Sequence, residues 1–372
     1  MNIVVQIYMM VCVILLVFDI GFLIVKNARN QRFYPRMPRF EKRVGEEIEQ
    51  KNTTGEFSAG WLDSVRERCR KTKYLLALQG VLEVKPYARD WFREVVYSLL
   101  FEYRKKSDYE QAYYAYVVSA LGYERARISS YFASEFLSFL KSGSLYTFSN
   151  TMAAVYEFGD LCILMNAIDV VDERAGFYYK KLFVDGLLSA RVDKKELAAA
   201  LMEQYDRYSD FTKECILEYF RFAEVDAGDF CRRVISLEPK GSQVRYTAIR
   251  YFLKYPDEKA KGMFADMLRS REEGGWVEEM LAIQGLGRWQ EKEIRDLMKS
   301  HITSENWYVR VNALEYLKNS GMDEQEIAEI IGLEDPYTNE ALVYQYREDP
   351  VMSDYIGRLI EEQKNRSKEE EN

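Results

Sequence analysis

Histidine is almost absent from this chain of 372 residues, and cysteine is sparse. The single histidine, His301, is expected at the surface or in a turn. The cysteines are odd in number, widely spaced and never arranged as CxxC: Cys12, Cys69, Cys162, Cys215 and Cys231. Zinc sites need clustered ligands and disulfide frameworks need paired cysteines, so neither is expected. The thiols are therefore predicted to be reduced, as in a reducing compartment.

Signatures of common catalytic and nucleotide-binding sites are also missing. The chain has no GxxxxGK[ST], no GxGxxG that follows a strand and no GxSxG. Carboxylates are abundant, but on helical repeats they mostly form solvated faces. We therefore predict a protein that is not an enzyme and has no catalytic residues, bound metal or cofactor. The alternative is a lyase or hydrolase of helical-repeat type, with an acid site in a groove.

Proline is rare, with only 7 residues, whereas residues that favour helices are frequent. Apolar residues recur at i, i+3, i+4 and i+7 in segments of roughly 10–20 residues, which short turns separate. One such face carries Trp91, Val95 and Leu99, and another carries Leu197, Leu201 and Tyr205. This periodicity predicts an all-α fold.

The first 25 residues differ from the rest, because Ile3–Val25 is apolar except for Gln6 and Asp19. A helix rises about 1.5 Å per residue, so this run would span about 34 Å, enough to cross a bilayer. A cleaved signal peptide is the alternative, but it needs a basic start, a shorter apolar core and a small-residue cleavage site. The run has none of these three features. Residues 1–25 are therefore predicted to form a transmembrane helix.

Basic residues follow this run and none precedes it. Seven of them form what we call the basic collar: Lys26, Arg29, Arg32, Arg36, Arg39, Lys42 and Arg43. The positive-inside rule predicts a single-pass protein with its N-terminus outside and its C-terminal domain in the cytoplasm. The collar also suits contact with anionic lipids, since each basic residue near such a surface contributes about 1 kcal/mol. The two roles are compatible.

Without the collar, Asp19 and Glu41, the chain retains 45 basic and 58 acidic residues, a net charge near −13. This balance opposes nucleic-acid binding, which needs a basic face. The predicted partners are proteins and anionic membrane lipids. A lipid- or nucleic-acid-binding module with a stripe of Lys and Arg is a further alternative.

Asp19 is the one acid within the apolar run. An ionisable group at the centre of a bilayer costs about 2.5–3.5 kcal/mol on insertion scales. One interpretation is a polar contact with the transmembrane helix of a partner. The other is an off-centre acid that water or headgroups reach.

Residues 26–58 contain Pro35, Pro38 and several turn formers, and they are predicted to be a basic juxtamembrane segment and linker. Residues 59–205 are predicted to be a divergent helical-repeat region, and residues 206–360 a regular repeat array. The charged residues 361–372 are predicted to be a disordered tail.

A repeat stands out in the second half of the chain. Phe211, Val244, Val277 and Val309 follow one another at spacings of 33, 33 and 32, and a weaker copy starts near Tyr337. The residues four and five positions later are small or apolar in every copy. Two helices in about 33 residues, repeated, are typical of an α-solenoid, in which neighbours must stack to bury their apolar faces.

Two of these copies resemble HEAT repeats. Val309-Arg310-x-x-Ala313-Leu314 matches the VRxxAL core of the first helix of that family, and Val244–Phe252 repeats it. The acidic residue usual five positions before the valine is Ser304 in one copy and Pro239 in another, and only Glu272 fits in a third. The full Asp–Arg ladder of the family is therefore not expected here. The resemblance implies an α-α superhelix, a HEAT-like solenoid. The ankyrin and tetratricopeptide patterns are absent.

The predicted function is that of a membrane-tethered scaffold that binds a membrane protein and a cytoplasmic protein. The layout, with the stretch Phe177–Ser189, resembles single-pass bacterial membrane proteins found with processive family-2 glycosyltransferases, which implies an accessory role in envelope or exopolysaccharide assembly. The many tyrosines, 28 in all, either pack between helices or form a partner-binding face.

Overall fold

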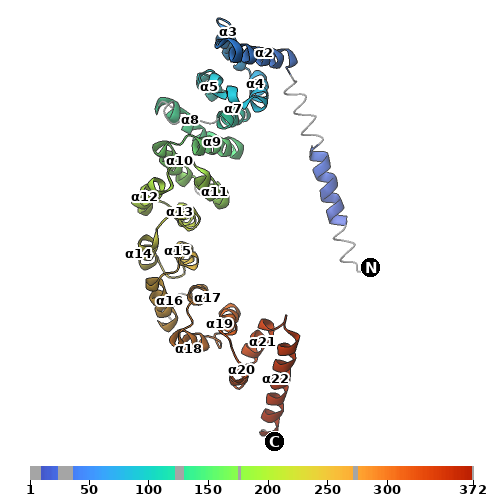
Figure 1. Cartoon of the computed structure of the whole chain (residues 1–372), viewed down its shortest axis with the longest axis vertical. Coiled ribbons are helices and arrows are strands. Elements are labelled where there is room, and N and C mark those ends of the chain that lie inside the picture. Colours follow the sequence, from blue (N-terminus) through green and yellow to red (C-terminus); the bar gives the residue numbers. More distant parts are fainter. Residues whose placement is uncertain (1–9, 24–36, 122–129, 175–176, 271–274, 371–372) are drawn as a thin grey trace. The chain divides into compact units, whose positions relative to one another are not determined.

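The computed structural model describes residues 10–23, 37–121, 130–174, 177–270 and 275–370, and every regular element in these ranges is a helix (Figure 1). The predicted all-α fold is confirmed for this part of the chain. Contacts divide the chain into two compact units, Met1–Asp193 and Lys194–Asn372, which we call unit 1 and unit 2. Within each unit, helix pairs stack in a solenoid-like arrangement.

Unit 2 contains the predicted repeats. The first helix of each pair packs against the first helix of the next pair: α13 (Asp210–Ala223), α15 (Gln243–Lys254), α17 (Gly275–Leu286), α19 (Trp307–Asn319) and α21 (Pro336–Gln345). The second helices are α14 (Gly228–Leu237), α16 (Glu258–Ser270), α18 (Lys292–Lys299), α20 (Glu324–Ile331) and α22 (Pro350–Glu370). Helix α12 (Lys194–Gln204) precedes them.

The predicted repeat register is confirmed by burial. The residues four and five positions after the repeat start are buried in all copies: Cys215, Ile216, Ala248, Ile249, Leu281, Ala282, Ala313, Leu314, Ala341 and Leu342. Because these residues are buried on helices that pack on one another, the stacking of pairs closes a continuous apolar core.

Unit 1 follows the same rule with a longer repeat. One row contains α2 (Pro38–Thr54), α4 (Thr72–Val84), α7 (Asp108–Leu121), α9 (Leu145–Glu157) and α11 (Lys180–Ser189), each packed on the next. The other contains α3 (Trp61–Cys69), α5 (Arg89–Tyr97), α6 (Leu100–Arg104), α8 (Ser130–Ser142) and α10 (Leu161–Glu173). From α4 to α11 the starts of the first-row helices are 36, 37 and 35 residues apart. The helix-pair rhythm therefore extends through residues that carry no clear sequence repeat.

The prediction of a linker over residues 26–58 is wrong for α2. Pro38 occupies the first turn of this helix, where proline is favoured because its missing N–H would have no partner there. Phe40, Val44 and Ile48 recur at helical spacing and are buried, and α2 packs on α4. Gly55 ends the helix in the left-handed conformation, with φ 82°.

The prediction of a disordered tail from residue 361 is also wrong, because α22 continues to Glu370. Its first half is anchored through Ile356, which is buried, and contacts α20 and α21. The following Glu, Lys, Arg and Gln residues are good helix formers, so an anchored helix propagates through them.

At the N-terminus, residues 10–23 form a helix whose residues are all exposed. The remainder of the predicted transmembrane segment, residues 1–9 and 24–25, lies outside the described residues. Among the helices that the structure describes, none is both long enough and apolar enough to cross a membrane.

His301 lies in the turn after α18, as predicted, but it is buried rather than at the surface. Its Nδ1 atom is 2.9 Å from the carbonyl oxygen of Leu297, and its Nε2 atom is 3.4 Å from a carboxylate oxygen of Glu279. The contact with Leu297 holds the turn against α18, and Glu279 of α17 lies beside the ring.

Buried polar residues link successive repeats of unit 2, at the position directly after the repeat start. Arg245 donates from Nε to Glu278, its equivalent in the next repeat, at 3.0 Å, and the backbone N–H of Gly241 donates to the same carboxylate oxygen. Arg310 donates to Thr338, again its equivalent, at 3.2 Å and also to Asp335. Two pairs of successive repeats are therefore joined by buried polar contacts, at a position other than the one used by the Asp–Arg ladder of the family.

Tyrosine hydroxyls form a second set of links. Tyr251 donates to the carbonyl oxygen of Val225 in the turn of the preceding helix pair, at 3.1 Å, and accepts from the backbone N–H of Ala227. Tyr316 donates to Trp289 in the same way, and in unit 1 Tyr103 donates to Cys69 at 2.9 Å. Part of the high tyrosine content thus satisfies carbonyl groups at the turns, where the helices leave them unpaired.

The Arg245–Glu278 pair gives the first prediction. Arg245→Met leaves the Glu278 carboxylate buried without its cation, so we expect unit 2 to lose about 3–5 kcal/mol of unfolding free energy. Replacing both residues, as Arg245→Met with Glu278→Leu, should recover most of this loss because no buried charge remains. Urea denaturation followed by circular dichroism measures both, and a double variant no more stable than Arg245→Met would contradict the account.

Glu326 gives a prediction on pH. Hydrogen bonds from Arg295 and Lys299 outweigh burial and lower the pKa of Glu326 to about 2. Because the folded pKa lies below that of the unfolded chain, the stabilisation is complete at neutral pH and is lost as pH falls from about 4.5 to about 2. We expect Glu326→Gln to unfold more easily than the wild type at pH 7, with the difference vanishing near pH 2. The exposed Glu315→Gln is the control, and an equal pH dependence in both variants would refute the assignment.

Candidate functional site

The structure describes three residues of the basic collar. Arg39, Lys42 and Arg43 lie exposed on α2, where Arg43 donates to Glu47 at 2.6 Å. Lys26, Arg29, Arg32 and Arg36 lie outside the described residues. Lipid contact by the collar therefore stays a prediction.

Asp19 lies on the helix of residues 10–23 and is exposed there. The apolar side chains around it are exposed as well, from 44% for Val11 to 68% for Phe18. Its contact with a transmembrane partner stays a prediction.

Two buried cysteines are not activated thiols. Burial raises the pKa of Cys69 and of Cys231 to about 12, so both are protonated thiols and poor nucleophiles at neutral pH. Within the residues that the structure describes, no three side chains of His, Cys, Asp or Glu lie close enough together to hold a metal ion.

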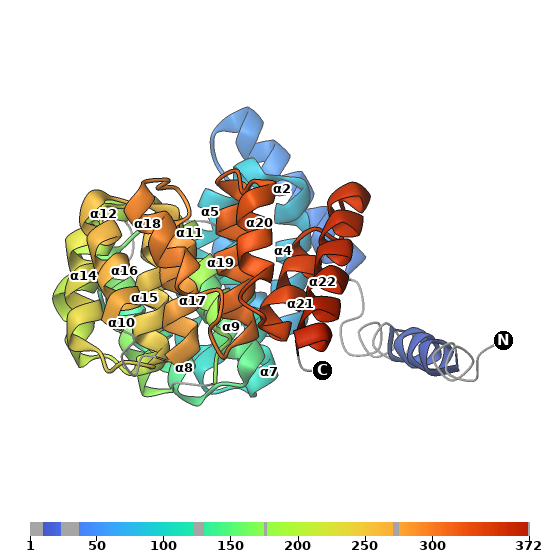
Figure 2. The same ribbon diagram turned by 90° about the horizontal axis from the view of Figure 1, so that it is seen from below.

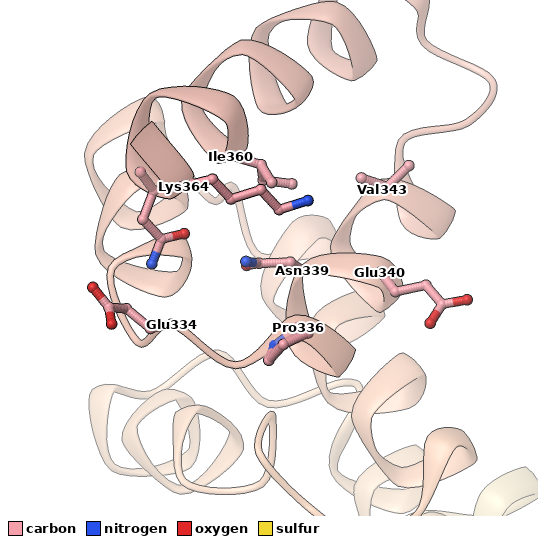
Figure 3. Close-up of a pocket in the computed structure, with 8 residues that line it drawn as sticks. Glu334, Pro336, Asn339, Glu340, Val343, Ile360 and Lys364 are labelled. Atoms are coloured by element: carbon pink, nitrogen blue, oxygen red, sulfur yellow. The ribbon is translucent and has the colours of Figure 1, made fainter. Parts of the chain in front are cut away.

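A groove lies between α21 and α22 in unit 2 (Figure 3). These two helices lie side by side in both views of the chain (Figures 1 and 2). The cavity has a volume of about 500 Å³, in the range that holds a ligand or an anchoring side chain. Its walls are formed by Glu334, Pro336, Asn339, Glu340 and Val343 on one side and by Ile360, Gln363 and Lys364 on the other.

Asn339 lies between these walls, pointing from α21 toward α22 (Figure 3). Its side chain is only 9% exposed, and its Oδ1 atom is buried without a hydrogen-bond partner. A buried acceptor without a donor costs about 1–3 kcal/mol. Because the oxygen is buried, a donor in the groove recovers this energy only when the Asn339 side chain turns outward to meet it.

The groove lies in the acidic part of the chain. The last 72 residues contain 17 acidic and 7 basic residues, whereas the first 300 contain 43 acidic and 45 basic residues. The negative charge of the protein is therefore concentrated in the last two helix pairs. Glu334 and Glu340 place exposed carboxylates at the rim of the groove itself.

Apolar side chains are exposed near these carboxylates on the same helices and their turns: Leu333, Tyr337, Val343, Tyr344 and Val351. Exposed apolar residues among polar ones mark interaction sites when they occur together. The lining itself holds two carboxylates and the ammonium group of Lys364, a net charge of −1 (Figure 3). With the acidic helices around it, the groove suits a ligand that is both basic and apolar, with a hydrogen-bond donor for Asn339.

Sequence reasoning missed this groove. Its residues come from two segments about twenty positions apart, and no motif joins them. The charge asymmetry between the first 300 and the last 72 residues is present in the sequence. It does not show in a single net charge calculated for the whole body.

Comparison with known proteins yields no match to a family model, to a curated protein or to a solved structure.

The unpaired oxygen of Asn339 leads to a prediction. Asn339→Leu replaces it with an apolar side chain of similar size, so we expect the unfolding free energy of unit 2 to rise by about 1 kcal/mol. Thr338→Val is the matched control on the same helix, because the Thr338 hydroxyl is paired with Ile302 and Arg310, and its loss should destabilise the unit. Urea denaturation distinguishes the two, and a clear loss of stability in Asn339→Leu would contradict the account of Asn339.

Proposed function

We propose that the chain is a non-catalytic scaffold, tethered to a membrane by its N-terminal helix, that recruits a protein partner to the groove between α21 and α22. The observation that carries the proposal is the unpaired, buried acceptor of Asn339 inside a groove rimmed by carboxylates. Stacked helix pairs are well suited to such a role, because they present extended surfaces to which a partner protein can bind.

The helix of residues 10–23 supports the tether. An apolar helix in a water-soluble protein normally buries one face, but here apolar side chains are exposed all round. Such a helix is stable only in an apolar environment, and a bilayer supplies one for every face at once. With the basic collar behind it, the N-terminus lies outside and both units lie in the cytoplasm.

The acidic surface around the groove supports a basic partner. A lysine or arginine side chain would donate to Asn339 and meet Glu334 and Glu340, while apolar residues beside it would cover Tyr337 and Val343. A basic amphipathic helix has this composition. Tethering would hold such a partner near a membrane protein and raise its effective concentration there.

The family context stays a proposal as well. The VRxxAL resemblance and the stacked helix pairs are consistent with divergent HEAT repeats. An accessory role beside an envelope or exopolysaccharide glycosyltransferase fits the membrane layout of the chain.

Crosslinking followed by affinity purification tests the scaffold role. The full-length protein, a variant lacking residues 1–25 and the groove variant Glu334→Lys/Glu340→Lys are compared. We expect the full-length protein to pellet with membranes and the shortened one to remain in the supernatant, with both retaining one cytoplasmic partner. The groove variant should lose that partner about tenfold or more, since two attractive charges become repulsive.

Glu315→Lys/Glu329→Lys is the charge-matched control, because it makes the same change in net charge on exposed residues outside the groove lining. If both lysine variants lose the partner equally, the groove is not the docking site. If neither the full-length nor the shortened protein enriches a specific partner, the scaffold proposal fails.

A further inference from the structure

A second cavity lies in unit 1, between α2 and α3, and its charge is opposite to that of the groove. It has a volume of about 320 Å³ and is lined by Arg39, Phe40, Arg43, Val44, Trp61, Ser64, Val65 and Arg68. Three of these residues are arginines and none is acidic. The segment from Pro38 to Arg70 as a whole contains as many acidic as basic residues, so the helices sort their charges and direct the arginines to this cavity.

The floor of the cavity is apolar and fixed. Phe40, Val44 and Val65 are buried, and the Phe40 ring packs edge-on against Tyr74. Trp61, on the wall, packs against Phe57 and Phe92 with ring centroids 5.0 and 5.7 Å away. A rigid floor and wall leave the shape of the cavity in place before a ligand arrives.

The arginines differ in their partners. Arg43 is paired with Glu47, whereas neither Arg39 nor Arg68 has an ion pair or hydrogen bond to another side chain among the described residues. The arginines beside Arg68 behave otherwise, since Arg66 on α3 pairs with Asp63 at 3.4 Å and Arg70, directly after α3, pairs with Glu67 at 3.1 Å. Two of the three arginines that line the cavity, Arg39 and Arg68, are thus unpaired, whereas Arg66 and Arg70 beside it are paired.

We propose that this cavity binds a phosphate group, with Arg39 and Arg68 as its main donors and Ser64 as a further donor. The guanidinium group offers a planar fork of N–H donors that matches two phosphate oxygens, which a lysine does not. The apolar floor suits the glycerol or acyl part next to the phosphate of a lipid. The ligand class is therefore a phosphate monoester, of a lipid headgroup or of a small soluble molecule.

The site is independent of the partner groove and of the scaffold role. Arg39 belongs to the basic collar, but Arg68, Ser64 and Trp61 lie outside it and come from a different helix. A diffuse collar would bind any anionic surface through its total charge. If the cavity is the site, Arg68, which lines it, contributes to binding, whereas Arg66 on the same helix does not.

Native mass spectrometry of the full-length protein in a neutral detergent tests this difference, with dihexanoyl phosphatidic acid as the probe. Because a basic residue at an anionic surface is worth about fivefold in affinity, we expect Arg68→Gln to weaken binding about fivefold or more. The double variant Arg39→Gln/Arg68→Gln should weaken it about 25-fold. The affinity of Arg66→Gln, the matched control, should stay within about twofold of the wild type. The affinity of Arg68→Lys should lie between those of the wild type and Arg68→Gln.

Dihexanoyl phosphatidylcholine and glycerol 3-phosphate complete the design. Binding of phosphatidic acid alone identifies a lipid headgroup as the ligand, and equal binding of glycerol 3-phosphate identifies a soluble phosphate ester. Equal losses in Arg66→Gln and Arg68→Gln, equal binding of phosphatidylcholine, or no binding of either phosphate monoester would overturn the proposal. Thermal melts of all variants check the fold, which the exposed position of Arg68 should leave unchanged. Partner recruitment to the groove should persist in Arg68→Gln, so the two proposals fail separately.

Discussion

The structure depends on one constraint: a single helix pair cannot bury its own apolar face. Each first helix therefore packs its small and apolar residues against the next first helix, as Ala248, Leu281 and Ala313 do in unit 2. Small residues at these positions let the helices approach closely, and larger ones fill the space beside them. Since every pair needs its neighbour, the stability of each unit is approximately the sum of the contacts between adjacent pairs.

Apolar stacking alone does not specify how far one pair slides along the next, because apolar contact is not directional. Buried polar contacts supply that direction. Arg245 reaches Glu278 and Arg310 reaches Thr338, and tyrosine hydroxyls bind carbonyl groups in the preceding turns. A shift of one helical turn would leave these groups buried without partners, at a cost of several kcal/mol. The same position holds a cation in one repeat and its acceptor in the next, which accounts for the weak sequence similarity between the copies.

The sequence predicted the stacking better than the sites. The spacing of Phe211, Val244, Val277 and Val309 located the first helices of unit 2, because small and apolar residues recur there at a fixed period. Helix α2 was missed because proline breaks a helix in its interior but is favoured in its first turn. Pro38 occupies the first turn. The cavity of Arg39 and Arg68 and the groove around Asn339 were missed for another reason. Each joins side chains from separate helices, and which faces of those helices meet is decided by packing, not by local pattern.

Stacking also constrains which faces of the first helices stay open. Inside each unit both faces of a first helix are occupied by neighbours, so residues there are constrained by packing. The first helix pair of unit 1 and the last pair of unit 2 each lack one neighbour in their own unit, and their side chains are free to carry charge. One of these pairs holds unpaired arginines around a cavity, and the other holds carboxylates around a groove. In each case the lining comes from both helices of one pair, because the surface that a further pair would cover stays open.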